Sequence, residues 1–252
     1  LLEPLFGQER RIDPEALVAG QAVVDLLSGA LALDPALGRT IVGGHASQGG
    51  PGGSGGPGAA TSDARRFAER ALEGLACAIA LATALDLDES GLDGTTLLEL
   101  GRGVAFRDLG LPRVVAASAG RRTRPGPGGS AAIHGHPALG VRLLSEALGS
   151  TPSWAAPVAG HHERLDGSGY PGGRRGDQLP RSVRVAGLAD TFTWLIAPAA
   201  WGSVRAADEV IGVLRFGAHG RFGDDLVWAL VQILESGWLL PLRRPGTADT
   251  TH

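Results

Sequence analysis

Apolar residues recur at intervals of three and four along most of the chain, which is the spacing that places side chains on one face of an α-helix. The first such segment covers residues 13–33, where Asp13 followed by Pro14 is a typical helix start. Its apolar face consists of Leu17, Val24, Leu27 and Leu31. The pattern predicts an amphipathic helix at this end of the chain.

The same spacing continues through residues 62–87, with apolar positions from Phe67 to Leu85 and Ser62 as a candidate N-cap. We expect a long, largely buried helix there. Further helices are expected at about 94–109, 137–149, 153–164, 181–197, 204–216 and 224–236, separated by clusters of glycine and proline. No alternating β-branched run is present, so the predicted fold class is all-α, a helical bundle with an N-terminal helical arm.

Glycine and proline indicate how the chain is divided. The sequence has 40 Gly and 16 Pro among 252 residues, and many of them lie between residues 43 and 61. Because such a segment has few apolar side chains to bury, it is typical of a flexible loop. We therefore expect an N-terminal helical segment at 1–42, a flexible loop at 43–61, the main domain at 62–240 and a tail at 241–252.

Composition and charge narrow the function classes. With 43% hydrophobic residues and a formal charge of −3, the chain is typical of a globular protein without a strong field for a nucleic-acid polymer. The longest uncharged apolar stretch, Gly74 to Leu85, is shorter than the roughly 18 residues that a membrane span needs. We therefore expect no membrane segment and a cytoplasmic location. Cys77, the only cysteine, is interpreted as a core residue.

Four of the seven histidines lie between residues 134 and 162, and residues 161–171 read HHERLDGSGYP. Adjacent histidines can present two imidazoles to one point, and imidazole with carboxylate suits Fe, Mn or Zn. From composition alone, an exposed turn rich in glycine fits the segment equally well.

Residues 161–171 match the HHExxDGxGYP signature without a gap, and on this basis the chain resembles HD-GYP domains, bacterial metal-dependent phosphodiesterases that hydrolyse cyclic di-GMP. Upstream, residues 133–140 resemble the start of that family's histidine-proline helix. Downstream, residues 184–190 resemble the segment that ends in its metal-binding aspartate, here Asp190. The resemblance covers about residues 62–236 and implies the family's helical bundle.

The chain departs from the family at the HD motif itself. The family reads His-Asp-Ile-Gly-Lys where this chain reads Arg107-Asp108-Leu109-Gly110-Leu111, so a histidine ligand and a phosphate-contacting lysine are replaced. An earlier family histidine aligns with Arg70, or with Glu69 if the register shifts by one. The family's Arg-Pro-Tyr-Arg segment is not recognisable at Pro198–Trp201.

These substitutions fall on one side of the two-metal site that the resemblance implies. The first metal would take Asp108, Asp190 and the two missing histidines. The second metal would take Asp108, His136, His161 and His162, and this set is complete. The resemblance therefore implies one divalent transition metal per chain, Fe, Mn or Zn.

The side chain of Arg107, which replaces a histidine at the first site, has two possible positions. Asp108 and Asp190 need a cation if they are buried, and the guanidinium of Arg107 can pair with a carboxylate through two hydrogen bonds. The alternative is that Arg107 points into solvent. In either case a guanidinium cannot generate a nucleophile.

The glycine-rich part of the signature has two interpretations. By resemblance, Gly167, Gly169, Tyr170 and Pro171 form a lip that faces substrate or a partner domain; by local chemistry alone they form a structural turn. Asp108, Glu163 and Asp166 are the candidate catalytic carboxylates, although Glu163 also fits a residue that orients a histidine or contacts a helix. His134 is interpreted as an ordinary surface or loop residue.

We therefore expect a degenerate HD-GYP domain with weak or absent cyclic di-GMP phosphodiesterase activity, acting on cyclic di-GMP or a related nucleotide. One alternative is a non-catalytic module that senses a nucleotide or docks a signalling partner domain. The other is a single-metal phosphohydrolase acting on another nucleotide. The chain has no lysine to replace the one missing at Leu111.

Overall fold

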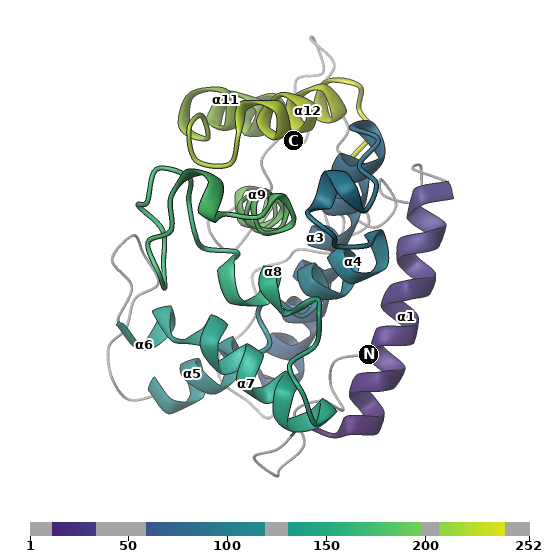
Figure 1. Cartoon of the computed structure of the whole chain (residues 1–252), viewed down its shortest axis with the longest axis vertical. Helices are drawn as coiled ribbons and strands as arrows, with labels where there is room; N and C mark the ends of the chain where they lie inside the picture. The colour runs from purple at the N-terminus through teal and green to yellow at the C-terminus, as the bar shows by residue number, and fades with distance from the viewer. Residues whose placement is uncertain (1–11, 34–58, 119–130, 198–206, 240–252) are drawn as a thin grey trace, which may run out of the picture.

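The structure, a computed structural model, describes residues 12–33, 59–118, 131–197 and 207–239 (Figure 1). These residues form helices without any β-strand, so the predicted all-α class is confirmed. In chain order the elements are α1 (Pro14–Leu33), α3 (Ala59–Ala84), η2 (Ser90–Leu92), α4 (Leu97–Ala105), α5 (Leu111–Ser118), α6 (Ala131–His134), α7 (His136–Leu148), α8 (Ala155–Gly160), η3 (Gly176–Gln178), α9 (Arg181–Ile196), α11 (Ala207–Gly217) and α12 (Asp224–Glu235).

Helix α1 begins as the sequence predicts. The carboxylate of Asp13 accepts a hydrogen bond from the backbone N–H of Glu15 at 3.0 Å, and Pro14 is the first helical residue. The helix packs on α3 and α4, and three of its predicted apolar positions, Leu17, Val24 and Leu31, are buried in the same hydrophobic core as those helices. The N-terminal arm is therefore an integral part of the bundle.

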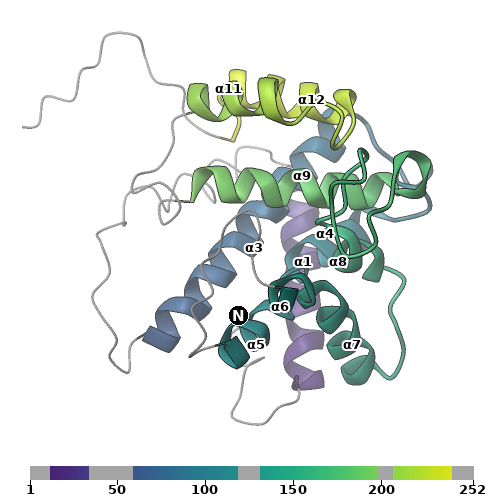
Figure 2. The ribbon, with the colours of Figure 1, turned by 90° about the vertical axis from the view of Figure 1, so that its left-hand side faces the viewer.

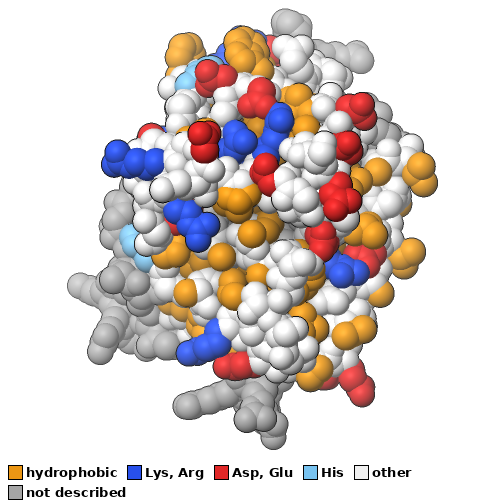
Figure 3. All heavy atoms as spheres, viewed as in Figure 1, with side chains coloured by type: hydrophobic (Ala, Val, Ile, Leu, Met, Phe, Trp, Pro, Cys, Tyr) orange, Lys and Arg blue, Asp and Glu red, His pale blue; other side chains and the backbone are white. Residues whose placement is uncertain are grey.

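The outer face of α1 is apolar as well. Val18, Leu26 and Leu33 are exposed there, and Figure 3 shows apolar side chains along the edge that α1 forms. By length and composition alone, α1 is apolar enough to cross a membrane, because Asp25 is the only charged residue after its first turn. A criterion based on uncharged stretches does not identify this helix, because Asp25 interrupts its apolar sequence. The expected absence of a membrane segment, like the expected cytoplasmic location, therefore stays a prediction.

Helices α3 and α9 form the centre of the bundle. Every residue from Leu75 to Ala82 of α3 is buried, and so is every residue from Val185 to Asp190 of α9, because neighbouring helices surround both. Helices α11 and α12 lie side by side as a layer over α9, while α4 and α8 pack on its other side (Figures 1 and 2). Cys77 is fully buried in this centre, as expected for a core residue.

Several helix boundaries differ from the prediction, among them the end of α4 at Ala105, which leaves Asp108 on a turn. Helix α3 begins at Ala59, so Ser62 lies inside the helix and residues 59–61 do not belong to a loop. Helix α8 ends at Gly160, which leaves the paired histidines on a turn. The short helices α5 and α6 were not predicted, because one or two turns offer too little periodicity to recognise. The rest of the expected loop at 43–61, the tail at 241–252 and Pro198–Trp201 lie outside the described residues.

Close helix packing next to the histidines depends on Gly110, which lies between α4 and α5. A Cβ atom at this position would come within 2.2 Å of the His136 carbonyl oxygen and 2.7 Å of the Gly140 nitrogen. No real Cβ atom approaches backbone this closely, so the turn after α4 can contact the start of α7 only with glycine here. This contact fixes the distance between residues 107–109 and His136.

We predict that Gly110→Ala lowers the free energy of unfolding by about 2 kcal/mol or more, because the clash is with backbone that has no freedom to rotate away. Gly212→Ala is the matched control. It lies within α11 with nothing near the added methyl group, so it should leave stability unchanged or raise it by up to about 1 kcal/mol. Urea denaturation of both variants measures the difference, and equal effects would contradict the packing described.

Candidate metal centre

Four side chains converge from three separate parts of the chain. Asp108 comes from the turn between α4 and α5, His136 from the first residue of α7, and His161 and His162 from the turn after α8. One ligand atom from each lies within 4.8 Å of the others. Because metal–ligand bonds are about 2 Å long, ligands of one ion lie up to about 4 Å apart, so this grouping fits a shared ion after small adjustments.

The two most buried histidines are oriented as metal ligands are. The Nδ1 atom of His136 lies 2.7 Å from the carbonyl oxygen of Ile133, and that of His161 lies 3.1 Å from the carbonyl oxygen of Val158. A carbonyl can only accept, so each Nδ1 carries the proton and each Nε2 presents its lone pair. The two Nε2 atoms face each other at 3.2 Å, an arrangement that a cation between them stabilises.

The charge states of Asp108 and His162 also suit metal binding. Burial raises the pKa of Asp108, but its contacts with His136 and His161 and the charges of Arg107 and Arg70 lower it further, so the net pKa is well below its usual value. Burial and the neighbouring His161 lower the pKa of His162 far below its usual value. Near pH 7 the site therefore offers a carboxylate and a neutral imidazole, the forms that bind metal.

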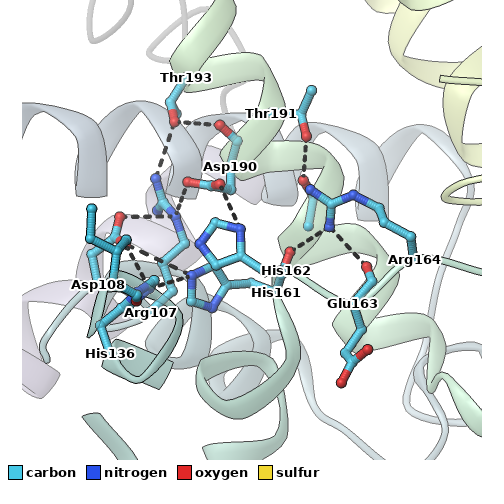
Figure 4. Close-up of polar contacts among 12 residues, drawn as sticks. Arg107, Asp108, His136, His161, His162, Glu163, Arg164, Asp190, Thr191 and Thr193 are labelled. Atoms are coloured by element: carbon cyan, nitrogen blue, oxygen red, sulfur yellow. Dashed lines mark hydrogen bonds and ion pairs between the residues drawn. The ribbon is translucent and has the colours of Figure 1, made fainter. Parts of the chain in front are cut away.

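Arg107 is buried beside this cluster, with 1% of its side chain exposed. Its Nε donates to Asp190 Oδ1 at 3.1 Å and lies 3.6 Å from Asp108 Oδ2, so the guanidinium sits between the two carboxylates (Figure 4). The remaining contacts of the guanidinium are also internal: Val104 and Arg70 carbonyl oxygens and the Thr193 hydroxyl. The alternative that Arg107 points into solvent is excluded.

Space for this guanidinium is provided by Gly74 on α3. A Cβ atom at position 74 would lie 2.5 Å from Arg107 Nη1 and 3.1 Å from its Cζ. Any other residue at this position would therefore displace the arginine. The sequence alone gave no sign of this pairing, because a single glycine inside a helical pattern is not informative.

A second arginine binds the same carboxylate. Arg70 Nη2 donates to Asp190 Oδ1 at 3.2 Å, so both substituted ligand positions hold cations on Asp190. Burial raises the pKa of Asp190, whereas the charge of Arg107 lowers it most strongly, and the net pKa is well below its usual value. Leu111, half-buried at the start of α5, adds no charge.

Tyr170 of the signature covers one side of the histidine cluster. Its ring stacks on His162 with the centroids 4.5 Å apart, and on His134 with the centroids 4.1 Å apart. His134 therefore supports the tyrosine that contacts a candidate ligand, a role that our interpretation of it as an ordinary surface residue missed. Gly169 allows the loop to approach, because a Cβ there would lie 2.3 Å from the His162 carbonyl oxygen.

Two of the candidate catalytic carboxylates, Glu163 and Asp166, do not reach the cluster. Glu163 is buried, but its carboxylate points away from the histidines (Figure 4) and accepts hydrogen bonds from the backbone N–H groups of Gly172 and Arg174. Asp166 is exposed and accepts from Ser168. The carboxylate oxygens of both residues accept hydrogen bonds from N–H groups or a hydroxyl of the loop that includes Gly167 and Pro171. Both residues therefore stabilise the shape of this loop.

Arg164 is a further residue that the sequence did not single out. Its Nη1 donates to the carbonyl oxygens of His161 and Glu163, and its guanidinium lies 4.5 Å from the ring centre of Phe222. It therefore fixes the backbone of the turn that carries the paired histidines.

Comparison with known proteins agrees with this geometry. The family model described as HD domain matches residues 62–226, about two thirds of the chain and all four members of the cluster. The chain belongs to the HD domain family. Within that family, residues 161–171 carry the signature of HD-GYP domains, and relatives named as cyclic di-GMP phosphodiesterases align with the chain, so it is an HD-GYP domain.

The relatives of this HD-GYP domain are longer proteins. It is 34% identical over 90 residues to the cyclic di-GMP phosphodiesterase response regulator RpfG of Xanthomonas campestris, an alignment that covers 35% of this chain and 24% of the relative. It is 28% identical over 123 residues to 3'3'-cGAMP-specific phosphodiesterase 3 of Vibrio cholerae, covering 48% of this chain and 26% of the relative. The chain thus spans about a quarter of the length of these relatives.

A solved structure supports the fold. Bd1817, an HDG"Y"P protein from Bdellovibrio bacteriovorus, superposes with a TM-score of 0.51 over 91% of this chain and 74% of its own, at 14% sequence identity. At this identity the likeness concerns the arrangement of helices. It confirms the HD-GYP helical bundle that the signature implied.

We predict that Gly74→Ala destabilises the HD-GYP domain by about 1–3 kcal/mol, although glycine to alanine within a helix is ordinarily favourable, because the methyl group displaces Arg107. In an Arg107→His background the same change should cost little, since the shorter side chain leaves room. A double-mutant cycle by urea denaturation measures the coupling. Additive effects would show that Arg107 does not occupy the space beside Gly74.

The environment of Glu73 predicts that the stability of the protein depends on pH. Burial raises its pKa to about 7, despite the charges of Arg70 and Arg107. The folded state then keeps a proton that the unfolded chain loses above about pH 4.5, so this contribution to stability is complete below that pH and is lost as pH rises through 7. Glu73→Gln should therefore raise Tm relative to the unmodified protein more at pH 8 than at pH 5.

Thermal denaturation at the two pH values measures this effect. Glu209→Gln on the exposed face of α11 is the control and should shift Tm equally at both pH values. An equal shift for Glu73→Gln as well would show that Glu73 is charged in the folded state throughout this range.

Proposed function

We propose that this HD-GYP domain binds one divalent transition metal ion and a cyclic dinucleotide, and that it hydrolyses cyclic di-GMP weakly or not at all. The observation that carries the proposal is the position of Arg107. Its guanidinium lies between Asp108 and Asp190, where the resemblance to HD-GYP enzymes implies a first metal. A permanent protein charge thus takes the place of one ion of the pair.

The donor set supports one ion at the remaining site. Asp108, His136, His161 and His162 offer one carboxylate and three imidazoles within 4.8 Å of one another, a set that suits Fe, Mn or Zn. When bound there, such an ion supplies Lewis acidity toward a phosphate oxygen. The hydrogen bonds of His136 and His161 to backbone carbonyls hold their imidazoles ready for this binding.

Weak turnover follows from what a guanidinium cannot do. In two-metal phosphodiesterases, the two ions together activate water and stabilise the leaving oxygen. Arg107 neutralises Asp190, but it has no position to offer to water or to a leaving oxygen, because its contacts lie within the protein. The protein therefore keeps the charge of the first site and loses its chemistry.

The substrate class rests on the relatives, two of which are named for cyclic di-GMP and for 3'3'-cGAMP. Both are cyclic dinucleotides, so a ligand with two bridging phosphates is the class that we propose for this domain. One of these relatives is a response regulator, which supports a signalling partner domain for this chain as well.

We predict that the purified protein carries about one transition-metal ion per chain and that His161→Ala removes it, because the loss of one of four ligands weakens metal binding strongly. Elemental analysis of the dialysed protein measures the content. Cyclic di-GMP turnover, followed by chromatography, should be far slower than that of a two-metal enzyme.

Restoration of the family residues provides the complementary test. Arg70→His, Arg107→His and Leu111→Lys together should raise both the metal content and the rate, whereas Arg107→His alone should change little, since the other histidine is still absent. Two tightly bound ions in the unmodified protein, or efficient hydrolysis without metal, would contradict the proposal.

A further inference from the structure

The two arginines at Asp190 differ in how they use their donors. The guanidinium of Arg107 is buried and donates to four oxygens of the protein, those of Asp190, Val104, Arg70 and Thr193. It is held as a structural cation. No approach from solvent is open to it, since only 1% of its side chain is exposed.

Arg70 is arranged for a different purpose. Within the described part of the chain, its guanidinium donates one side-chain hydrogen bond, from Nη2 to Asp190 Oδ1 at 3.2 Å, and 31% of its side chain is exposed. A guanidinium has five N–H donors, so Arg70 keeps others for a ligand. Its charge is maintained, because burial lowers its pKa but the carboxylates of Asp190, Asp108 and Glu73 raise it above the usual value.

The position of Arg70 relative to the histidines is set by Asp190. One oxygen of that carboxylate accepts from Arg70, and the other lies 3.9 Å from Nδ1 of His162, a member of the four-residue cluster. A single carboxylate thus separates the exposed arginine from the metal cluster. An anion bound both to a metal ion in the cluster and to the remaining donors of Arg70 would therefore lie beside Asp190.

The charges near the cluster favour such an anion. Arg70 and Arg107 together balance Asp108 and Asp190, so a divalent ion in the cluster leaves the site positive. Glu73, which lies on α3 near Arg70, reduces this excess where it is ionised. Arg164 does not compete for the anion, because it donates to the carbonyl oxygens of His161 and Glu163.

We propose that Arg70 is a phosphate-binding residue, whose free N–H donors hold a non-bridging oxygen of the dinucleotide phosphate that lies beside the metal cluster. This role deepens the proposed function and rests on it. It compensates for Leu111, which stands where the family has its phosphate-contacting lysine. Arg70, which stands where the family has a metal-binding histidine, thereby supplies the positive charge that is lost with leucine at position 111.

Isothermal titration calorimetry on the full chain loaded with Mn²⁺ tests the proposal, with cyclic di-GMP as one probe and inorganic phosphate as a second. Arg70→Gln should raise the Kd for cyclic di-GMP about 10- to 100-fold, the loss expected for a hydrogen bond to a charged group, while Mn²⁺ content stays the same. Arg70→Lys should keep part of the affinity. Arg66→Gln, an exposed arginine one helical turn away, removes the same charge and should leave Kd unchanged.

Each outcome decides between the two proposals. Unchanged Kd in Arg70→Gln would overturn the role of Arg70 and leave the proposed function intact, and so would an equal loss of affinity in Arg66→Gln. Loss of Mn²⁺ from Arg70→Gln would also overturn the role of Arg70, because the arginine would then support the metal cluster. If the unmodified protein binds phosphate through Arg70 but does not bind cyclic di-GMP, the inference on Arg70 stands and the proposed ligand class fails. Binding of neither probe would overturn both.

Discussion

The carboxylate of Asp190 has to be neutralised inside the protein, and much of the site depends on how this is done. Asp190 lies on α9, in the centre of the bundle, and its Oδ1 accepts from both Arg107 and Arg70. Removal of one partner from a buried ion pair typically costs about 3–5 kcal/mol, because the other charge remains without compensation. The arginines therefore tie α3, the turn after α4 and α9 together at the candidate site.

Because arginines neutralise Asp190, the candidate metal centre has two different halves. On one side the protein's own cations satisfy the carboxylates, and Gly74 makes room for one of them, Arg107. On the other side Asp108 and three histidines are left with ligand atoms that face one another. A guanidinium is fixed in charge and has no open coordination position, so the first half contributes electrostatics while the second half keeps the capacity to bind metal.

The long helices could be predicted from the sequence because their apolar repeats extend over several turns. The four-residue cluster could be predicted because the resemblance to HD-GYP domains, which the signature at 161–171 carries, implies its members. Burial of Arg107 could not be decided in this way, since the residue that accommodates it, Gly74, lies on another helix. His134 was missed because its partner Tyr170 is distant in sequence. The backbone partners of Glu163 could not be predicted, because a buried carboxylate can accept from N–H groups of a distant loop as well as take part in chemistry.

The most direct test of the account is a crystal structure of the protein loaded with Mn²⁺ or Zn²⁺, with anomalous scattering measured at the absorption edge of the metal. The account predicts one anomalous peak, bounded by Asp108, His136, His161 and His162, with Arg107 on Asp190. Two peaks on either side of Asp108, with the side chain of Arg107 displaced from Asp190, would contradict it.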